Sequence, residues 1–159
     1  MTDPHNDRIR WAEEQAGVYD DEEHGQEQGA TSVSFFAYGT PAPQGSKKHV
    51  GRGIMIEASK DLPAWRQAIM DAAQDAHQGA PLDGPLSVQL DVYLPKPKRP
   101  RFNVPATGLD LDKLQRAVGD SLEKAGVIAN DARICRWDAQ KHYAAGNRTG
   151  AHITIKETP

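Results

Sequence analysis

Apolar and polar residues alternate in four segments of the chain, as they do in strands that have one face on a core. The segments are 32–39 (SVSFFAYG), 85–95 (PLSVQLDVYLP), 132–143 (ARICRWDAQKHY) and 151–157 (AHITIKE). In the second segment, four aliphatic residues recur at every other position. A shorter apolar segment, 53–58 (GIMIEA), predicts a fifth strand. Between the first and fifth strands, two prolines and a glycine predict a loop over 40–48 (TPAPQGSKK).

Two other segments repeat apolar residues with the spacing of an amphipathic helix. The first extends from residue 62 to about Gly79, with Pro63 in its first turn and either Ser59 or Asp61 as its cap. The second lies within 109–126 (LDLDKLQRAVGDSLEKAG), and its apolar stripe ends before a glycine. Strands and helices alternate irregularly, so the sequence predicts an α+β fold with a single mixed β-sheet and two helices.

The first 31 residues differ from the rest in composition and charge. They are polar and interrupted by glycines, and they hold nine acidic and two basic residues, a net charge of -7. The other 128 residues hold 13 acidic and 17 basic residues, a net charge of +4. We therefore expect an acidic, mostly disordered tail over 1–31 and one folded domain over 32–159. A basic domain is compatible with a polyanionic partner such as nucleic acid.

Several protein classes are excluded by composition. No apolar run approaches the roughly 20 residues of a membrane-spanning helix, and the N-terminus has no secretory signal. Cys135 is the only cysteine, which excludes a disulfide framework and a zinc ribbon and indicates a reducing cytoplasmic compartment. Its place in a predicted strand indicates a small core residue, and Trp65 on a helix stripe is predicted in the core as well.

Three aspartates are the candidate chemical groups. Asp110 and Asp112 stand at the start of the second helix, and Asp131 follows after the helix has ended. Alternate residues converge in an extended segment but diverge in a helix, so the pair converges only if the helix begins at or after Asp112. Clustered carboxylates repel unless a cation lies between them, and hard oxygen ligands favour Mg²⁺ or Mn²⁺. Such a site suits hydrolysis of a phosphodiester.

A purely structural interpretation of the same residues stays open at this point. Asp112 and Gln115 have the spacing of a capping box, and Asp110 fits a solvated turn. Asp131 follows Asn130, as in an ordinary hairpin turn.

Basic residues are concentrated in two loops. They are Lys96, Lys98, Arg99 and Arg101 in one loop and Lys47 and Lys48 in the other. Such side chains bind phosphates and position a duplex without reading its sequence, although a solvated loop has the same composition. Phe102 in the first loop fits either a wedge inserted into DNA or a residue packed on its own domain.

The segment Asp110 to Asp131 (DLDKLQRAVGDSLEKAGVIAND) resembles the core of the RusA-type Holliday-junction resolvases. That family has an Asp-Leu-Asp motif, a helix with this apolar spacing that ends in Ala-Gly, and an acidic residue before a strand. The resemblance is strong over 108–143. From about Ser34 onward, the rest of the chain matches in the order of its elements and in the proline-rich loop.

The resemblance implies roles for particular residues. Asp110, Asp112 and Asp131 would bind the catalytic Mg²⁺, with Mn²⁺ as a substitute. Arg116 stands where the family usually has a functional lysine four residues after the second aspartate, and Lys113 replaces the usual asparagine. The residues expected to contact DNA are Lys47, Lys48, Lys96, Lys98, Arg99, Arg101, Lys113 and Lys141.

The resemblance also implies an activity, namely Mg²⁺-dependent endonucleolytic resolution of four-way DNA junctions. A homodimer is expected because two strands must be cut symmetrically and a two-fold axis supplies two equivalent sites. The expected location is the cytoplasm of a bacterial or phage-infected cell. The alternative is a noncatalytic DNA-binding protein of the same fold, and the presence of all three aspartates favours the enzyme.

Overall fold

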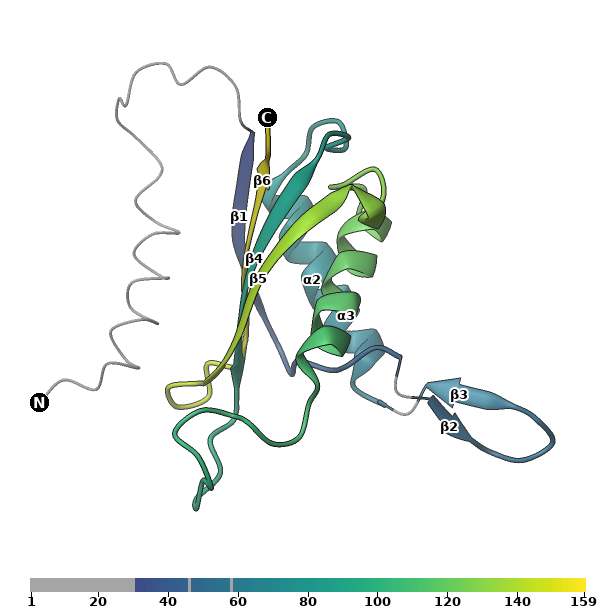
Figure 1. Cartoon of the computed structure of the whole chain (residues 1–159), viewed down its shortest axis with the longest axis vertical. Helices are drawn as coiled ribbons and strands as arrows, with labels where there is room; N and C mark the ends of the chain where they lie inside the picture. The colour runs from purple at the N-terminus through teal and green to yellow at the C-terminus, as the bar shows by residue number, and fades with distance from the viewer. Residues whose placement is uncertain (1–30, 46, 58) are drawn as a thin grey trace, which may run out of the picture.

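The computed structural model describes residues 31–45, 47–57 and 59–159 (Figure 1). Its elements are β1 (Ser32–Tyr38), β2 (Lys47–His49), β3 (Met55–Glu57), α2 (Leu62–Ala76), β4 (Leu86–Leu94), α3 (Leu111–Lys124), the 3-10 turn η1 (Asp131–Arg133), β5 (Ile134–Tyr143) and β6 (Gly150–Glu157). The predicted tail lies, except for Thr31, outside the described residues. No helix in the described ranges is long and apolar enough to span a membrane.

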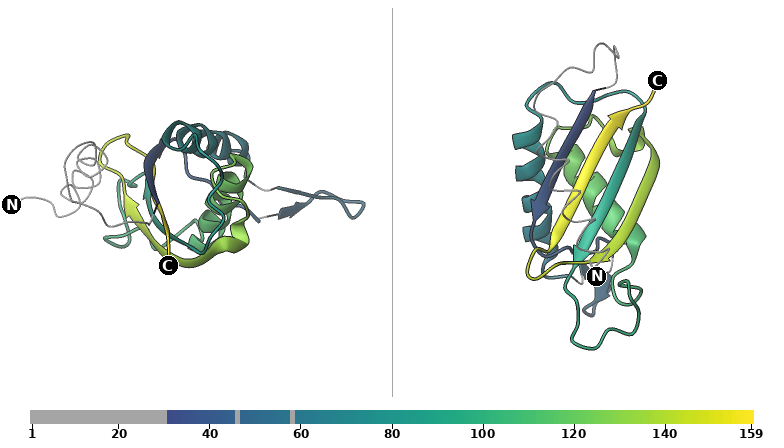
Figure 2. Two further views of the ribbon diagram at one scale, coloured as in Figure 1. Left: turned by 90° about the horizontal axis from the view of Figure 1, so that it is seen from above. Right: turned by 90° about the vertical axis from the view of Figure 1, so that its left-hand side faces the viewer.

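Four strands form one mixed sheet in the order β1-β6-β4-β5. β6 pairs antiparallel with both β1 and β4, whereas β4 and β5 are parallel. Parallel neighbours need a crossover connection, and α3 provides it between β4 and β5. Figure 2 shows the four strands side by side with both helices behind them. The predicted α+β fold with two helices on a single mixed sheet is confirmed.

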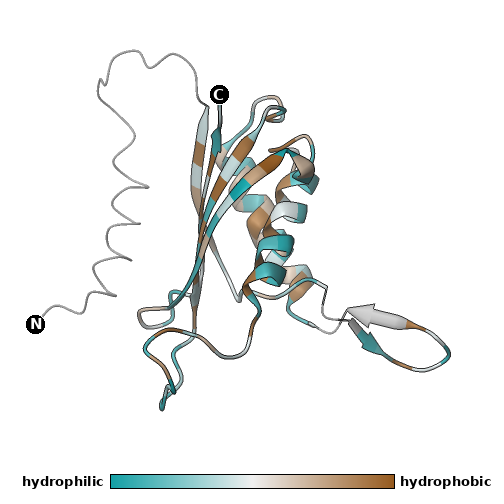
Figure 3. Cartoon of the chain, in the orientation of Figure 1, coloured by the Kyte–Doolittle hydropathy of each residue, from teal (hydrophilic) through white to brown (hydrophobic). Residues whose placement is uncertain are grey.

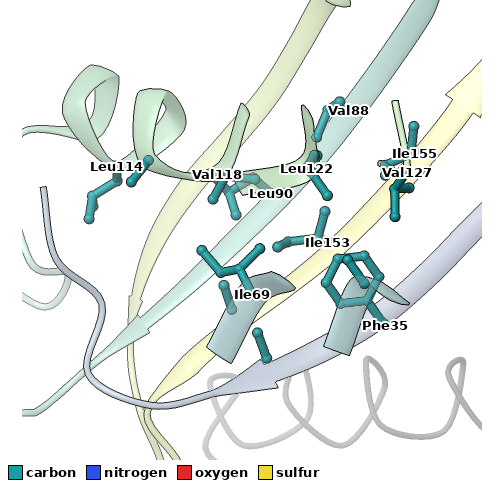
Figure 4. Close-up of a cluster of buried hydrophobic side chains, with 14 of the residues drawn as sticks. Phe35, Ile69, Val88, Leu90, Leu114, Val118, Leu122, Val127, Ile153 and Ile155 are labelled. Carbon is teal, nitrogen blue, oxygen red and sulfur yellow. The ribbon is translucent and has the colours of Figure 1, made fainter. Parts of the chain in front are cut away.

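Both helices cover the same face of the sheet, and the core lies between them and the strands (Figures 1 and 4). Hydrophobic and hydrophilic residues alternate along the strands (Figure 3), and successive side chains of a strand point to opposite faces, so one face of the sheet is apolar and is covered by the helices. The largest fully buried aliphatic side chains are Ile69, Leu86, Leu90, Leu114, Leu122, Ile128, Ile153 and Ile155. Trp65 is 2% exposed, as its place on the helix stripe predicted.

An ion-pair cluster joins the two helices at their outer surface. Arg66 of α2 and Lys124 of α3 both pair with Asp120 of α3, the latter at 3.4 Å. The first helix begins after Asp61, whose side chain makes no capping hydrogen bond, and it ends at Ala76.

Two sequence predictions about strands are wrong. The segment 40–48, predicted as a loop, includes β2, which pairs with β3 in a separate two-stranded hairpin. Cys135, predicted in the core, is exposed. The register explains why, since Leu86 of β4 lies opposite Ile134 and Ser87 lies opposite Arg136. Cys135 is the extra residue of a bulge, and this bulge breaks the simple alternation on which the prediction rested.

Candidate active site

The start of α3 separates the two aspartates of the Asp-Leu-Asp motif. The helix begins at Leu111, and Asp110 is its N-cap with an extended backbone (φ -75°, ψ 130°). The carboxylates of Asp110 and Asp112 could converge only if the helix began at Asp112 or later. The helix begins one residue earlier, so the two carboxylates do not converge. The Asp110 carboxylate pairs with Lys113 Nζ at 3.2 Å, and its side chain is 59% exposed. The capping-box interpretation of Asp112 fails as well, because Asp110 occupies the cap and makes no side-chain capping bond.

One face of α3 lines an open pocket of about 240 Å³. Its residues follow helical spacing and are Asp112, Gln115, Arg116 and Gly119. The opposite wall comes from η1 and β5, with Asp131, Ile134 and Trp137. The fold therefore brings Asp112, Arg116 and Asp131 together, whereas Asp110 does not line this pocket.

Hydrogen bonds to the end of α3 fix the position of Asp131. Its backbone N–H donates to Glu123 Oε2 at 3.0 Å. Asn130 Oδ1 accepts from the Ala132 N–H at 2.8 Å and caps the 3-10 turn. Asp131 thus lies in a capped turn before β5 rather than in a hairpin turn, and it lines the pocket.

Gly119 forms the floor of the pocket. A Cβ at this position would lie 3.6 Å from Trp137 Cζ2, 3.8 Å from Ile134 Cδ1 and 3.9 Å from Asp131 Cβ. Sequence reasoning missed both Gly119 and Trp137 as site residues. A signal was present, since glycine inside a helix costs about 1 kcal/mol relative to alanine and calls for a packing reason.

The loop that follows β1 packs against the first turns of α3. The Gln44 N–H donates to the Lys113 carbonyl at 3.0 Å. Gly45 has φ +95°, and a Cβ there would lie only 2.5 Å from Arg116 Nη1. The loop therefore packs closely against the guanidinium of Arg116.

The donor atoms of the pocket fit a hard divalent cation. Neither the Asp112 nor the Asp131 carboxylate has a hydrogen-bond or ion-pair partner among the described residues. Mg²⁺ is commonly held by one or two carboxylates, with water and substrate phosphate as the other ligands, and Gln115 adds an amide oxygen. Within the described ranges, no three acidic, histidine or cysteine side chains are close enough to hold a metal together.

Comparison with known proteins identifies the family. Residues 38–156 match the model of the family described as Endodeoxyribonuclease RusA. The chain belongs to the RusA endodeoxyribonuclease family. The match includes every residue of the pocket, and it confirms the resemblance noted in the sequence. No curated protein matched the chain.

The basic residues expected to contact DNA in this RusA-family protein lie in four places, one of which is Lys113 in α3. Lys96, Lys98, Arg99 and Arg101 are exposed in the loop between β4 and α3, while Lys47 and Lys48 are in β2. In that loop, Lys96 Nζ lies 5.9 Å from the centre of the Tyr143 ring, and Arg101 lies over Phe102, which is 44% exposed. Lys141 Nζ donates to the Leu109 carbonyl at 2.8 Å and so fixes the chain just before the Asp-Leu-Asp motif.

A second polar cluster lies on the sheet face opposite the helices. His142 Nε2 donates to Asp91 Oδ1 at 2.7 Å, and His152 Nε2 lies 3.1 Å from Ser34 Oγ. Burial raises the pKa of Asp91, but the hydrogen bond and charge of His142 outweigh it and hold that pKa below its ordinary value. Burial also lowers the pKa of His152, against the opposing effect of Asp91. Sequence reasoning missed this cluster, because it depends on the cross-strand register.

Proposed function

We propose that this RusA-family protein is a Mg²⁺-dependent endonuclease that resolves four-way DNA junctions as a homodimer. The observation that carries the proposal is the pocket in which α3 and η1 place Asp112 and Asp131 beside Arg116, with both carboxylates unpartnered among the described residues. Two carboxylates that line one pocket without a partner among the described residues attract a cation, so the arrangement favours a metal-binding role.

The residues of the pocket divide the work of phosphodiester hydrolysis. Asp112 and Asp131 would hold Mg²⁺, or Mn²⁺ in its place, with the Gln115 amide oxygen beside them. The ion would supply a Lewis acid and a water of lowered pKa. Arg116 contacts the phosphate with two parallel N–H groups and stabilises its negative charge.

Asp110 is the third carboxylate of the proposed set. Its carboxylate pairs with Lys113 in the structure, so it would bind the metal ion only after this ion pair breaks. When Lys113 is released in this way, it becomes available to a phosphate. Lys141, bonded to Leu109, supports the backbone on which Asp110 stands.

The loop between β4 and α3 contacts the phosphates of the junction. It carries four exposed bases, and Phe102 lies among them with 44% of its surface exposed. These contacts position the duplex near the pocket. A nuclease of this kind acts in the compartment that holds the DNA, which in a bacterial or phage-infected cell is the cytoplasm.

A cleavage assay tests the proposal. The protein is incubated with an end-labelled four-way junction or a linear duplex of the same sequence, in Mg²⁺, Mn²⁺ or EDTA. We expect symmetric cuts in the junction with either metal, and none with EDTA. Sedimentation of the same preparation gives the oligomeric state, for which we expect a dimer. Junction binding without cleavage in either metal would instead support the noncatalytic DNA-binding alternative.

A further inference from the structure

The β2–β3 hairpin is not used by the site described above. Its strands pair antiparallel from Lys47 opposite Glu57 to His49 opposite Met55. Figures 1 and 2 show it projecting from the helices and sheet near the end where α3 begins. A projecting hairpin needs a reason, because two isolated strands are marginally stable in water.

The tip of the hairpin has an unusual composition for an exposed turn. Val50 and Ile54 flank it, with exposed fractions of 49% and 54%, and the Val50 N–H donates to the Ile54 carbonyl at 3.1 Å. Between them lie Gly51, Arg52 and Gly53, all with positive φ. A Cβ at either glycine would meet nothing within 4 Å, so Arg52 stands at an apex with no side chain on either side of it.

Arg52 occupies a backbone conformation that favours glycine. It has φ 50° and is the one non-glycine residue with positive φ in the described ranges. A left-handed conformation costs an ordinary residue on the order of 1 kcal/mol. Glycine at this position would form the same turn with less strain, so the side chain of Arg52 is the feature that needs a function.

The base of the hairpin is tied to the pocket. The Gln44 backbone is bonded to Lys113 of α3, and Gly45 packs against the guanidinium of Arg116. The five steps from Lys47 to Arg52 extend at most about 17 Å at roughly 3.3 Å each. That reach corresponds to about five base pairs at 3.4 Å per pair. A duplex that is cut at the pocket and runs along the hairpin would have its segment about five base pairs from the scissile phosphate beside the tip.

We propose that the β2–β3 hairpin inserts Arg52 into the DNA minor groove about five base pairs from the cleaved phosphate. The minor groove is about 6 Å wide, and an apex flanked by glycines is narrow enough to enter it. Its negative potential attracts an arginine, and Val50 and Ile54 pack against the sugars at its rim. This inference rests on the proposed function, because the pocket sets the position of the duplex.

Charge favours DNA over a second copy of the chain as the partner of the hairpin. Residues 47–57 hold three bases, Lys47, Lys48 and Arg52, against one acid, Glu57. The domain over 32–159 is itself net positive by +4, so the same domain of another copy would repel the tip.

The test combines a variant of the tip with a change in the groove. Arg52→Gly removes the charge and suits the left-handed turn, so the hairpin is expected to fold. Arg136→Ala removes one exposed arginine from β5, on the sheet face opposite the helices, and serves as the matched control. The DNA is a four-way junction, unmodified or with 2,6-diaminopurine replacing adenine four to six base pairs (roughly the reach of the tip) from the cleavage point. This base adds an amino group to the minor groove only. Affinity is measured without divalent metal.

We expect the base substitution to weaken wild-type binding about 5- to 20-fold, the size of one good groove contact. Arg136→Ala should show the same loss, whereas Arg52→Gly should bind both junctions equally and more weakly than wild type. An equal effect of the base on wild type and Arg52→Gly would overturn the proposal. Dissociation of the dimer by Arg52→Gly would also overturn it and make the hairpin a protein contact.

Cleavage of the same junctions in Mg²⁺ separates this inference from the proposed function. If the protein cuts junctions but the base has no differential effect, the hairpin proposal is wrong and the nuclease stands. If the differential effect appears without cleavage, the hairpin binds DNA and the nuclease proposal is wrong. A protein that binds no DNA contradicts both.

Discussion

In the described part of the chain, two clusters of titratable side chains lie on opposite faces of the same sheet. The cluster around Asp91 is half-buried or buried, with His142 bonded to Asp91 and His152 bonded to Ser34. The pocket cluster of Asp112, Asp131 and Arg116 is exposed, and its carboxylates have no partner among the described residues. Both lie at β5 and its neighbours, so the fold alone does not distinguish them.

The difference between the clusters indicates what each contributes. A buried polar group is costly unless it is hydrogen-bonded, and the partners of Asp91 satisfy that requirement. Its cluster can therefore support the stability of the sheet. Two unpaired carboxylates across an open pocket contribute nothing comparable to stability. The repulsion between the two carboxylates costs little free energy because both are solvated, and this cost is offset when a ligand of opposite charge binds. Substitutions should accordingly affect stability in one cluster and activity in the other.

Asp112→Asn should produce the largest effect, in activity alone. We expect cleavage of a four-way junction in Mg²⁺ to fall at least about 100-fold, equivalent to ~3 kcal/mol of transition-state stabilisation. Junction affinity without metal should hold or rise, because one negative charge is removed. The melting temperature should be unchanged or slightly higher. Asp138→Asn, which removes an exposed carboxylate from the opposite face, is the control. Cleavage at the wild-type rate would contradict the catalytic assignment.

Asp91→Ala should show the reverse pattern. The substitution removes the 2.7 Å hydrogen bond between Asp91 and the buried His142, so we expect the unfolding free energy to fall by about 2–4 kcal/mol. For a domain of this size, that lowers the melting temperature by roughly 5–15 °C. Cleavage measured well below the melting temperature should stay close to wild type. Asp138→Ala is the matched control, and an equal loss of stability in it would show that the Asp91 partners contribute nothing specific.

The contrast between the clusters also shows how far the sequence alone could reach. The alternation of apolar residues located the four sheet strands, and their helical spacing located both helices, because burial on one face leaves a periodic pattern. The Asp-Leu-Asp motif and Asp131 pointed to the end of the domain where the pocket lies. No pattern in the sequence indicated that α3 begins at Leu111. Because it does, Asp110 lies outside the helix and Asp112 lies within it.

What the sequence missed depends on contacts between distant segments. Asp91, His142 and His152 come together only through the pairing of β4 with β5 and β6. The bulge at Cys135 is a property of the register rather than of local composition. β2 was missed because its three residues form a strand only by pairing with β3.

The pH dependence of stability should distinguish His152 from the rest of the cluster. Burial lowers its pKa, so the folded state favours the neutral ring. As pH falls below about 6.5, the unfolded chain takes up that proton first, and stability declines until the folded pKa is passed. Asp91 affects the stability of the protein at lower pH than His152 does. Its folded pKa is depressed, so its contribution is present above about pH 4 and lost as pH falls through the folded value.

Urea unfolding of wild type and His152→Gln at several pH values measures this effect. We expect the stability of the variant to depend less on pH between about 7 and 5, while both proteins lose stability together near pH 4 and below. His77→Gln, at a half-buried histidine after α2, is the control for the loss of one imidazole elsewhere in the protein. Parallel curves for wild type and His152→Gln would show that this ring is not the group that titrates.

Gly119→Ala should have the smallest effect, and it should move stability and activity in opposite directions. The new methyl group meets Trp137 Cζ2 at 3.6 Å, an ordinary contact, so it can be accommodated without displacing the helix. Replacing a helical glycine should raise unfolding free energy by about 0.5–1 kcal/mol. The same methyl group takes up room in the pocket 3.9 Å from Asp131 Cβ, and we expect cleavage to fall several-fold.

Asp75→Ala, at an exposed position of α2, is the control for Gly119→Ala, because it improves helix propensity away from the pocket. It should raise stability with no change in cleavage. If Gly119→Ala is more stable and equally active, the floor of the pocket does not limit what binds there, and the glycine is needed only for the approach of α3 to β5. If it is less stable, the contact with Trp137 is tighter than an ordinary van der Waals contact, and the glycine supports the fold rather than the space between the two carboxylates.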